Sequence, residues 1–557
     1  MIEVLNLQAL RGIVGNTNGE LYYVKGHTSL GDGGGGIFMW RTDNVFINSD
    51  STGIYKNDNN GTIIKTTSIS GQSIGRWVRQ YEGNINVLYF GAFGKTQDYT
   101  TAFQSAIDFA SLNTLNDSEL KGSVVYIPNG NYRINTLLLK NGVSILGESI
   151  DKTFIQNTDN HNVDYMLEIE SGPVSLNMSN FSLFGRHETN AGCFLFDAKP
   201  LSVEPFHGGL WNSNIKNIKI SGFKGHGIYL RGSGNSLTTS DGLLPNQFNV
   251  FENVVVSKSS NFSNSLKLEG QNGQISFINC TFDGFSTKDN TIKTYSKGHN
   301  ISIKNKFQNT SAVISFINCT CQDSDYGFYI EWAENITIDN CWFENLGVAI
   351  TVKSSFSDAV NEQPSKGICI MNNRFANASG FGSLPAPNNI KSGQNISISK
   401  SYVSVLNNYT TVSYPNSPDN GNSLFLLANN NLVGGVTVSG NTFQVNKLGK
   451  TIGIMQVISV SNNTIDCSGN KLIFVNGSES VIKTIQSSIN ASEYLTIRAN
   501  GSSITFDNTN NIFLTLKSSL TLNNGEIATF VKIDNSVGLN SETYQLVSVM
   551  KGNTVVT

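Results

Sequence analysis

A short motif that recurs along the middle of the chain constrains the fold more than any other feature of the sequence. The heptapeptide ISFINCT occurs at Ile275–Thr281 and again at Ile314–Thr320. Related segments begin further along the chain, at Ile336, Ile368, Val436 and Ile458. The steps from Ile314 to Ile336 and from Val436 to Ile458 are both 22 residues. A repeat of this length is typical of solenoid proteins, in which each repeat packs on its neighbours.

The pattern within each repeat indicates the type of solenoid. Apolar residues alternate with polar ones, which is the periodicity of a β-strand, and many of them are β-branched. A second family of short strands begins at Gly227, Gly327 and Gly347 and falls between copies of the first. The LxxLxL pattern of leucine-rich repeats is missing. We therefore expect a parallel β-helix over residues 124–482, with at least two strands and about 22 to 25 residues per coil.

Strand alternation also predicts which side chains face the core, because successive side chains point to opposite faces. The residues expected inside are Phe328, Ile330, Ile336, Ile338, Val348 and Ile350. The neighbours expected outside are Tyr329, Glu331, Thr337, Asp339, Ala349 and Thr351. Cys280, Cys319 and Cys341 hold matching positions and are expected in the core. Ile317 and Val405 are expected on the outer walls, where they would suit contacts between subunits.

Other patterns flank the repeats. Residues 98–113 carry an N-cap in Asp98 and an apolar face formed by Phe103, Ala106, Ile107 and Ala110, so a short helix should cover the open end of the first coil. Beyond about Ile482 the repeat motif stops. We expect Tyr494–Phe506 and Leu520–Ile533 to form hairpins with Asn-Gly turns, which predicts an antiparallel β domain over residues 483–557.

Composition argues against several functions. Charged residues make up 14% of the 557 residues and the formal net charge is -3, so no general attraction to nucleic acid or to anionic membranes is expected. No apolar run is long enough to insert into a membrane, and the N-terminus lacks the zones of a signal peptide. The seven cysteines are expected to be reduced thiols. The six histidines lack ligand spacing and GDGGGG is not followed by GK[ST], so neither a metal nor a cofactor is expected.

One segment, Tyr326–Val352, combines carboxylates with aromatic residues among core-like strands. Hydrolysis of a glycosidic bond needs one carboxyl that protonates the leaving oxygen and another that activates water or attacks the sugar. We predict Glu331 and Asp339 as this pair, with Glu334 as the substitute for either. Rings beside them would contact the apolar faces of sugars; those predicted to do so are Trp332, Tyr329 and Trp342.

Two further groups are weaker candidates. Asp323 and Asp325 lie two residues apart near a bend and could bind substrate, although aspartate is also a common turn residue. His226, Tyr229 and Arg231 lie in GHGIYLRGSG, where Tyr229 and Arg231 should face outward. They could bind an acidic sugar or act in a β-elimination. The ordinary alternatives are a capped turn and a solvated arginine.

The N-terminal segments show a family resemblance. They are YVKGHTSLGDGGGGIFMWR from Tyr23, NNGTIIK from Asn59, GRWVRQY from Gly75, NVLYFGAFGKTQDYTTAFQSAIDFA from Asn86 and VVYIPNGNYRI from Val124. Together they resemble the N-terminal module and first coil of bacteriophage tailspikes with pectate-lyase-like β-helices. The resemblance implies an N-terminal tailspike module over residues 1–84, a connecting segment with the capping helix over 85–123, and a right-handed β-helix.

The same resemblance implies an all-β homotrimer on the tail of a virion, assembled in the host cytoplasm and attached to another tail or baseplate protein. Its partner would be a capsular or lipopolysaccharide glycan of the bacterial surface. We predict a hydrolase that depolymerises the glycan by cleaving glycosidic bonds. The alternatives are a lyase that cleaves it by β-elimination and an adhesin that only binds it.

Overall fold

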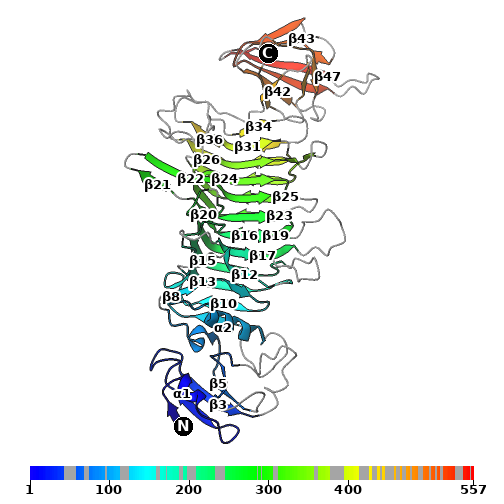
Figure 1. Cartoon of the computed structure of the whole chain (residues 1–557). Coiled ribbons are helices and arrows are strands. Elements are labelled where there is room, and N and C mark those ends of the chain that lie inside the picture. Colours follow the sequence, from blue (N-terminus) through cyan, green and yellow to red (C-terminus); the bar gives the residue numbers. More distant parts are fainter. Residues whose placement is uncertain are drawn as a thin grey trace. The chain divides into compact units, whose positions relative to one another are not determined.

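The structure is a computed structural model of the whole chain (Figure 1). It describes residues 1–42, 58–67, 75–94, 97–112, 124–158, 164–170, 172–186, 192–196, 209–232, 245–261, 263–284, 286–289, 292–304, 312–356, 362–376, 394–399, 401–412, 426–429, 436–439, 442–445, 457–459, 464–466, 472–476, 480–486, 494–500, 503–508, 511–514, 518–533, 543–551 and 554–556. The chain divides into two compact units. Unit 1 comprises residues 1–285 and 307–309, and unit 2 comprises 286–306 and 310–557.

Unit 1 begins with a small sheet that is packed on one short helix. The helix is α1 (Leu7–Arg11) and the strand order is β1 (Ile2–Val4), β2 (Leu21–Val24), β3 (Gly36–Arg41), β5 (Arg76–Gln80) and β4 (Ile63–Ile64). Phe38, Trp40 and Trp77 are buried between the sheet and the helix, and the two tryptophan rings lie 5.1 Å apart.

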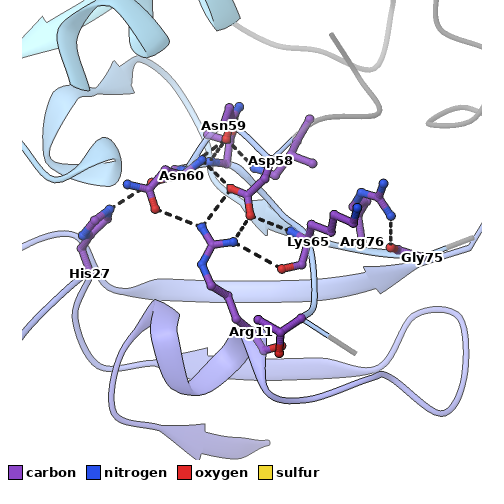
Figure 2. Close-up of polar contacts among 12 residues, drawn as sticks. Arg11, His27, Asp58, Asn59, Asn60, Lys65, Gly75 and Arg76 are labelled. Carbon is purple, nitrogen blue, oxygen red and sulfur yellow. Dashed lines mark hydrogen bonds and ion pairs between the residues drawn. The ribbon is translucent and has the colours of Figure 1, made fainter. Parts of the chain in front are cut away.

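Polar contacts fasten this module to the segment that precedes β4 (Figure 2). Arg11, at the end of α1, forms an ion pair with Asp58 and donates to Asn60 Oδ1 at 3.0 Å. The ring of His27 contacts the carbonyl oxygen of Asn60 through Nε2 at 3.0 Å. These bonds replace water for groups that the fold partly buries.

A connecting segment covers the first coil, as predicted. After β6 (Ile85–Asn86) and the 3₁₀ helix η3 (Val87–Phe90) comes α2 (Thr100–Leu112). The predicted apolar face of α2 is buried throughout, and Asp98 accepts the N–H of Thr100 at 2.8 Å. Gln104 exchanges hydrogen bonds with the backbone of Leu138 in the first coil, at 3.1 and 2.9 Å. The helix therefore supplies partners to backbone groups that would otherwise form an open edge.

Unit 1 continues as a parallel solenoid with three sheets. The first contains β7 (Val124–Ile127), β10 (Ser144–Gly147), the first halves of β13 (Asn177–Phe184) and β15 (Asn214–Ser221), the middle of β17 (Asn246–Ser257), and β19 (Asn272–Ile278). The second contains β8 (Gly130–Ile134), β11 (Thr153–Asn157), the last parts of β13, β15 and β17, and β20 (Thr281–Asp283). The third contains β9 (Leu137–Leu139), β12 (Tyr165–Ile169), β14 (Gly192–Phe196), β16 (Ile228–Arg231) and β18 (Leu266–Glu269).

Unit 2 has the same three-sheet construction. Its first sheet contains β23 (Ala312–Ile317), β25 (Glu334–Asp339), β29 (Ile368–Met371), β32 (Val403–Leu406) and β35 (Val436–Ser439). Its second contains the first parts of β24 (Thr320–Glu331) and β26 (Trp342–Lys353), then β30 (Arg374–Ala376), β33 (Tyr409–Val412) and β36 (Thr442–Val445). Its third contains the last parts of β22 (Ile292–Lys304), β24 and β26, then β31 (Gln394–Ser399) and β34 (Leu426–Asn429). Two short antiparallel pairs join β22 to β21 (Ser286–Asp289), and β27 (Ser355–Phe356) to β28 (Glu362–Gln363).

The register confirms the predicted repeat. Ile314 pairs with Ile336, and Ile368 pairs with Val403, which in turn pairs with Val436. The predicted coil length holds for only part of the chain. Stacked residues are 22 positions apart for Asn318 and Asn340, but 35 for Asn373 and Asn408 and 37 for Asn180 and Asn217. The additional residues lie in the connections between strands, whose lengths the strand pattern does not fix.

The core is formed by inward side chains that stack from coil to coil. Phe251 and Phe277 lie 4.8 Å apart in unit 1, and Phe343 and Phe375 lie 4.8 Å apart in unit 2. All the side chains predicted to be inside are buried. The three predicted core cysteines are buried too, and the N–H of Cys319 donates to Cys341 Sγ at 3.4 Å.

Three predictions about outward residues of unit 2 need correction. Val405 is buried because it continues the core column of Ile338 and Ile370, whereas Ile317 is 38% exposed, as predicted. Ala349 is also buried. Glu331 is buried despite its outward position, because Lys304 and Lys353 on the adjacent coils lie against its carboxylate.

Asparagine marks the corner between the first and second sheets. In unit 1 Asn180, Asn217 and Asn253 have φ angles of 64°, 52° and 53°, in the left-handed region that asparagine tolerates. Asn217 donates to Asn180 at 3.2 Å and Asn253 donates to Asn217 at 3.3 Å. This ladder accounts for the Asn that recurs in the sequence motif.

The C-terminal part of unit 2 differs from the prediction. Among the described strands of this part, neither predicted hairpin forms. β42 (Tyr494–Asn500) pairs with β46 (Ile527–Ile533), and β43 (Ile504–Asp507) pairs with β45 (Ser519–Leu522). The segments on either side of each Asn-Gly turn therefore belong to different sheets. Both sheets contribute side chains to one buried core.

The remaining C-terminal pairings are mixed. β37 (Val457–Ser459) pairs in parallel with β39 (Leu472–Asn476), which pairs in parallel with β42. β38 (Thr464–Asp466) and β41 (Thr484–Gln486) form a second parallel pair, and β40 (Ser480–Ile482) pairs in parallel with β43. β47 (Thr543–Lys551) is antiparallel to β46 and β48 (Thr554–Val556) and parallel to β44 (Ile512–Phe513). In the described part of the chain no helix is long and apolar enough to cross a membrane.

Candidate functional site

The predicted residues Tyr329 and Glu331 lie together on the outer side of the third sheet of unit 2. The hydroxyl of Tyr329 donates to Glu331 Oε2. Lys304 and Lys353 contact the same oxygen, with Nζ at 3.5 and 3.9 Å. The cause is the register, since Glu331 pairs with Lys304 of β22 on one side and with Lys353 of β26 on the other. A carboxylate on one coil therefore lies between lysines on its two neighbours.

Aromatic rings complete this Tyr329 cluster, which we define as His299, Lys304, Tyr326, Tyr329, Glu331 and Lys353. The ring of His299 lies 4.5 Å from that of Tyr329 and 4.8 Å from that of Tyr326. Lys353 Nζ lies 4.8 Å from the centre of the Tyr329 ring. Burial, together with the hydrogen bond to Glu331, raises the pKa of Tyr329 well above its ordinary value, so the phenol is neutral at physiological pH.

The exposures within the cluster explain why Glu331 is buried. Its side chain is 9% exposed, whereas those of Lys304 and Lys353 are 45% and 41% exposed. The carboxylate points outward, as predicted, but the two longer side chains extend over it. A ligand approaching this face therefore meets the cations first.

The structure does not bring Asp339 to this cluster. Asp339 ends β25 and accepts a hydrogen bond from Asn372 at 2.8 Å. Glu334 begins the same strand, so it lies five residues, or about 16 Å of extended chain, from Asp339. Trp332 lies at the corner before Glu334, with a φ of 53°, and is 7% exposed, so it offers little ring surface to a ligand.

The other predicted residues of unit 2 form separate contacts. Trp342 donates to Glu344 at 3.1 Å, and the guanidinium of Arg374 lies 4.6 Å above its ring. Asp323 accepts from Asn345 at 3.0 Å, and its φ of 58° identifies it as a bend residue. Asp325 is buried beside it.

The third sheet of unit 1 brings together all three residues of the other predicted group. Tyr229 and Arg231 lie on β16, and His226 lies just before it, with its ring 5.4 Å from that of Tyr229. The hydroxyl of Tyr229 donates to Glu269 of β18. Lys267, also on β18, lies 3.2 Å from Glu269 and 4.4 Å from the centre of the Tyr229 ring.

Two further contacts complete this Tyr229 cluster, which we define as Tyr165, His226, Tyr229, Arg231, Lys267 and Glu269. Arg231 Cζ lies 5.9 Å from the centre of the Tyr229 ring. The ring of Tyr165, on β12, lies 6.3 Å from the same ring. Arg231 is exposed, as predicted, and Lys267 is half-buried, whereas Glu269 is buried. Tyr229 was predicted to face outward but is only 8% exposed, because the side chains of Tyr165, His226 and Lys267 pack around its ring.

Protonation states in the Tyr229 cluster are set mainly by burial. Burial lowers the pKa of His226 to about 4, the charge of Lys267 adds to this effect, and Glu269 opposes it. His226 Nδ1 accepts the N–H of Asn264 at 3.2 Å, so the neutral ring carries its proton on Nε2. Burial and the bond to Glu269 raise the pKa of Tyr229 strongly, which keeps the phenol protonated.

The sequence pattern did not indicate several members of these clusters. Glu269 lies 40 residues from Tyr229 in the sequence, and Lys267 lies with it on the next coil. Lys304 and His299 lie on the coil before that of Glu331 and were missed for the same reason. Lys353 lies 22 residues after Glu331, which is the predicted coil length, so the repeat could have indicated it. A partner on an adjacent coil can be found from sequence only when the coil length is known, and that length varies along this chain. Among the described residues no group of three or more His, Cys, Asp or Glu could hold a metal ion.

Chemically, each cluster combines a neutral phenol, a carboxylate, an imidazole and cations. Tyr, Glu and His can transfer protons to or from a bound substrate, and Lys and Arg can hold an anionic group. Two-carboxylate hydrolysis has a different requirement, because its carboxyl groups must lie about 5 to 9.5 Å apart. Each cluster contains one glutamate.

Two protein families match parts of the sequence. Residues 3–82 match the phage tail protein small four-stranded β-sheet domain. Residues 84–198 match the rhamnogalacturonase A/epimerase, pectate lyase-like family. These matches confirm the resemblance inferred from the N-terminal motifs. Among functionally curated proteins the sequence has no match.

Solved structures of tailspikes resemble the fold. The tailspike protein of Acinetobacter baumannii phage AM24 has 15% identity and a TM-score of 0.49, over 79% of this chain and 64% of that one. The active domain of tailspike protein 2 from bacteriophage CBA120 has 15% identity and a TM-score of 0.39, over 89% and 57%. The tailspike of A. baumannii bacteriophage Fri1, a capsular polysaccharide depolymerase, has 14% identity and a TM-score of 0.48, over 100% and 95%. This chain thus spans less than two thirds of the first two.

Proposed function

We propose that this chain is part of a phage tailspike that binds a bacterial surface polysaccharide, either capsule or O-antigen, and depolymerises it. The phage-tail and pectate-lyase-like matches support this assignment, and the parallel β-helix agrees with it. The virion tail is the corresponding location, with another tail or baseplate protein as the attachment partner and a homotrimer as the assembly.

For the reaction we propose β-elimination at the Tyr229 cluster. The observation that carries this choice is the contact between Tyr229 and Glu269 with Lys267 and Arg231 beside the same ring. Elimination from a uronic acid needs a cation to neutralise the sugar carboxylate, a base for the C5 proton and an acid for the leaving oxygen. The cluster contains all three.

The roles follow from the protonation states. Arg231 and Lys267 hold the sugar carboxylate, which makes the C5 proton more acidic. Glu269 takes that proton, the C5–H electron pair forms the C4–C5 double bond, and the C4–O4 bond breaks. Tyr229 gives its proton to O4 and regains one from Glu269 through their hydrogen bond. His226 donates from Nε2 to a sugar oxygen.

Incubation with purified polysaccharides tests whether the chain cleaves at all. The panel comprises bacterial capsules and O-antigens with and without uronic acids, and size-exclusion chromatography measures the chain length of the product. We expect shortening of a uronic-acid glycan. If the protein binds such glycans and leaves every one at full length, the chain is an adhesin and the proposal is wrong.

Hydrolysis at Glu331 is the second candidate. It is favoured by the hydrogen bond between Tyr329 and Glu331, which orients one carboxyl group on the outer face. Glu334 or Asp339 would have to supply the second carboxyl. Cleavage in ¹⁸O-labelled water separates the two reactions, because hydrolysis adds one labelled oxygen to each new end and elimination adds none.

A further inference from the structure

The Tyr329 cluster has more positive charge than its own pairing requires. One carboxylate, Glu331, faces two lysines, so the three charges sum to one positive charge. A single lysine would neutralise Glu331. The Nζ–Oε2 distances of 3.5 and 3.9 Å are longer than the 2.7 to 2.9 Å of a strong charge-assisted hydrogen bond. Each ammonium carries three donors, and neither is held tightly by the glutamate.

The arrangement of these charges favours an anionic ligand from solvent. The lysines are four to five times more exposed than the carboxylate that they share. The positive groups therefore form the surface, and the negative one lies beneath it. Glu331 also keeps the lysines side by side, because adjacent coils place them on its two flanks. Unpaired lysines in these positions would repel each other and spread apart.

Rings next to the lysines determine what kind of anion fits. The ring of His299 contacts those of Tyr326 and Tyr329, at 4.8 and 4.5 Å between ring centres. Aromatic surface beside cations suits a sugar that carries an acidic group, because the apolar face of the pyranose covers the rings while the acid reaches the ammonium groups. Lysine binds as a point charge, so the two ammonium groups can hold a carboxylate without the bidentate fork of arginine. The carboxylate of a uronic acid is attached directly to the sugar ring, so it can reach the lysines while the pyranose lies on the aromatic side chains.

We infer that the Tyr329 cluster is a binding site for a carboxylate-bearing sugar, in which Lys304 and Lys353 hold the carboxylate and the rings of Tyr329 and His299 contact the pyranose. It uses different residues from the elimination centre and takes no part in cleavage. The inference rests on the proposed function only in taking an acidic glycan as the ligand. Its role is to retain the polysaccharide on the protein.

Glu331 and the ligand compete for the same lysines, so removing the lysines and removing the charge of Glu331 should change the dissociation constant Kd in opposite directions. Titration calorimetry of the full chain with galacturonate oligosaccharides at low salt measures the dissociation constant Kd. We expect the double variant Lys304→Gln/Lys353→Gln to raise Kd at least tenfold. Glu331→Gln removes the competing charge but keeps an acceptor for Tyr329, so it should lower Kd at least threefold. Circular dichroism and the melting temperature establish that both variants are folded.

Two controls isolate the site. Lys483→Gln/Lys532→Gln removes the same charge from unit 2 elsewhere and should leave Kd unchanged. Inorganic phosphate should compete at least tenfold less effectively than galacturonate at equal concentration. Equal competition would identify a general anion site and contradict the assignment. No binding by the wild-type chain, or wild-type Kd in the lysine double variant, or unchanged or weaker binding by Glu331→Gln, would each overturn it.

The same samples separate this inference from the proposed function. Unaltered galacturonate binding by the lysine variant, together with cleavage of a polysaccharide by the wild type, rejects the binding site and leaves the depolymerase assignment standing. The predicted changes in Kd without cleavage of any glycan would do the reverse.

Discussion

Tyr229 shows how a parallel coil assembles a reactive group from residues that are distant in sequence. Its ring stacks in register with Lys267 of the next coil, and Arg231, two positions along, stacks with Glu269. Neighbouring strands of a sheet lie about 4.8 Å apart, so each outward residue has the paired residue of the next coil beside it. Sequence alone indicated His226, Tyr229 and Arg231, because they share one strand segment. It could not indicate Glu269, which the fold brings in from 40 residues away, or Lys267, which pairs with Tyr229 from the next coil.

Replacement of Tyr229 by Phe removes the phenolic proton and keeps the ring. We expect the rate of glycan cleavage to fall by about 10² to 10⁴, the usual contribution of a general acid or base. The matched control is Tyr126→Phe, since Tyr126 is also a tyrosine whose pKa is raised by burial and by a neighbouring glutamate, Glu148, and it lies in the first sheet of the same unit. Both rates are measured by size-exclusion chromatography. Equal rates for the two variants would remove Tyr229 from the mechanism.

The partly buried imidazole of His226 makes stability depend on pH. Its pKa is about 4 in the folded chain and 6.5 in a solvated one, so the unfolded chain binds the proton first as pH falls. The contribution of His226 to stability is therefore complete above pH 6.5 and declines toward pH 4, by roughly 3 kcal/mol in total. Melting temperatures measured from pH 7 to 4 should fall less steeply for His226→Asn than for the wild type. Parallel curves would contradict the assignment of a buried neutral ring.

At the scale of the element, the strands could be predicted and their connections could not. Alternation at Ile314 and Ile336 predicts two inward-facing strands, and they pair as expected. Alternation contains no information on how many residues pass between sheets, so the coil length was underestimated. The Asn-Gly turns near Asn500 and Asn524 were misread for a related reason. A tight turn shows that the chain reverses but not which strand it will pair with, and the shared C-terminal core decides that.

The asparagine ladder tests the corner geometry directly. Asn217 has a φ of 52°, where alanine costs about 1 to 2 kcal/mol and glycine costs nothing in steric terms. Both Asn217→Ala and Asn217→Gly lose the bonds to Asn180 and Asn253. We expect the urea midpoint of unfolding to decrease from wild type to glycine to alanine.

An extended position provides the control for this order. Asn131, on β8, is exposed and does not have a positive φ. There glycine should be less stable than alanine, because glycine loses more backbone entropy on folding. If alanine is also the better replacement at Asn217, the left-handed corner does not govern the choice of asparagine.

For the whole molecule, we make a prediction about the number of chains in the assembly. The tailspike resemblance predicts a homotrimer, and Ile317 is an outward apolar residue of the kind that a subunit interface covers. Light scattering should return about three times the chain mass of 60.5 kDa. A mass near that of one chain at working concentration would contradict the trimer.

Absorbance in the near ultraviolet distinguishes elimination from hydrolysis, because only elimination creates a double bond at the new non-reducing end. The wild-type chain is incubated with a uronic-acid capsule that it shortens, and absorbance is recorded beside Tyr229→Phe and Tyr126→Phe. We predict that absorbance rises in step with shortening for the wild type and for Tyr126→Phe, and stays at baseline for Tyr229→Phe. Shortening by the wild type without any rise in absorbance would contradict elimination at the Tyr229 cluster.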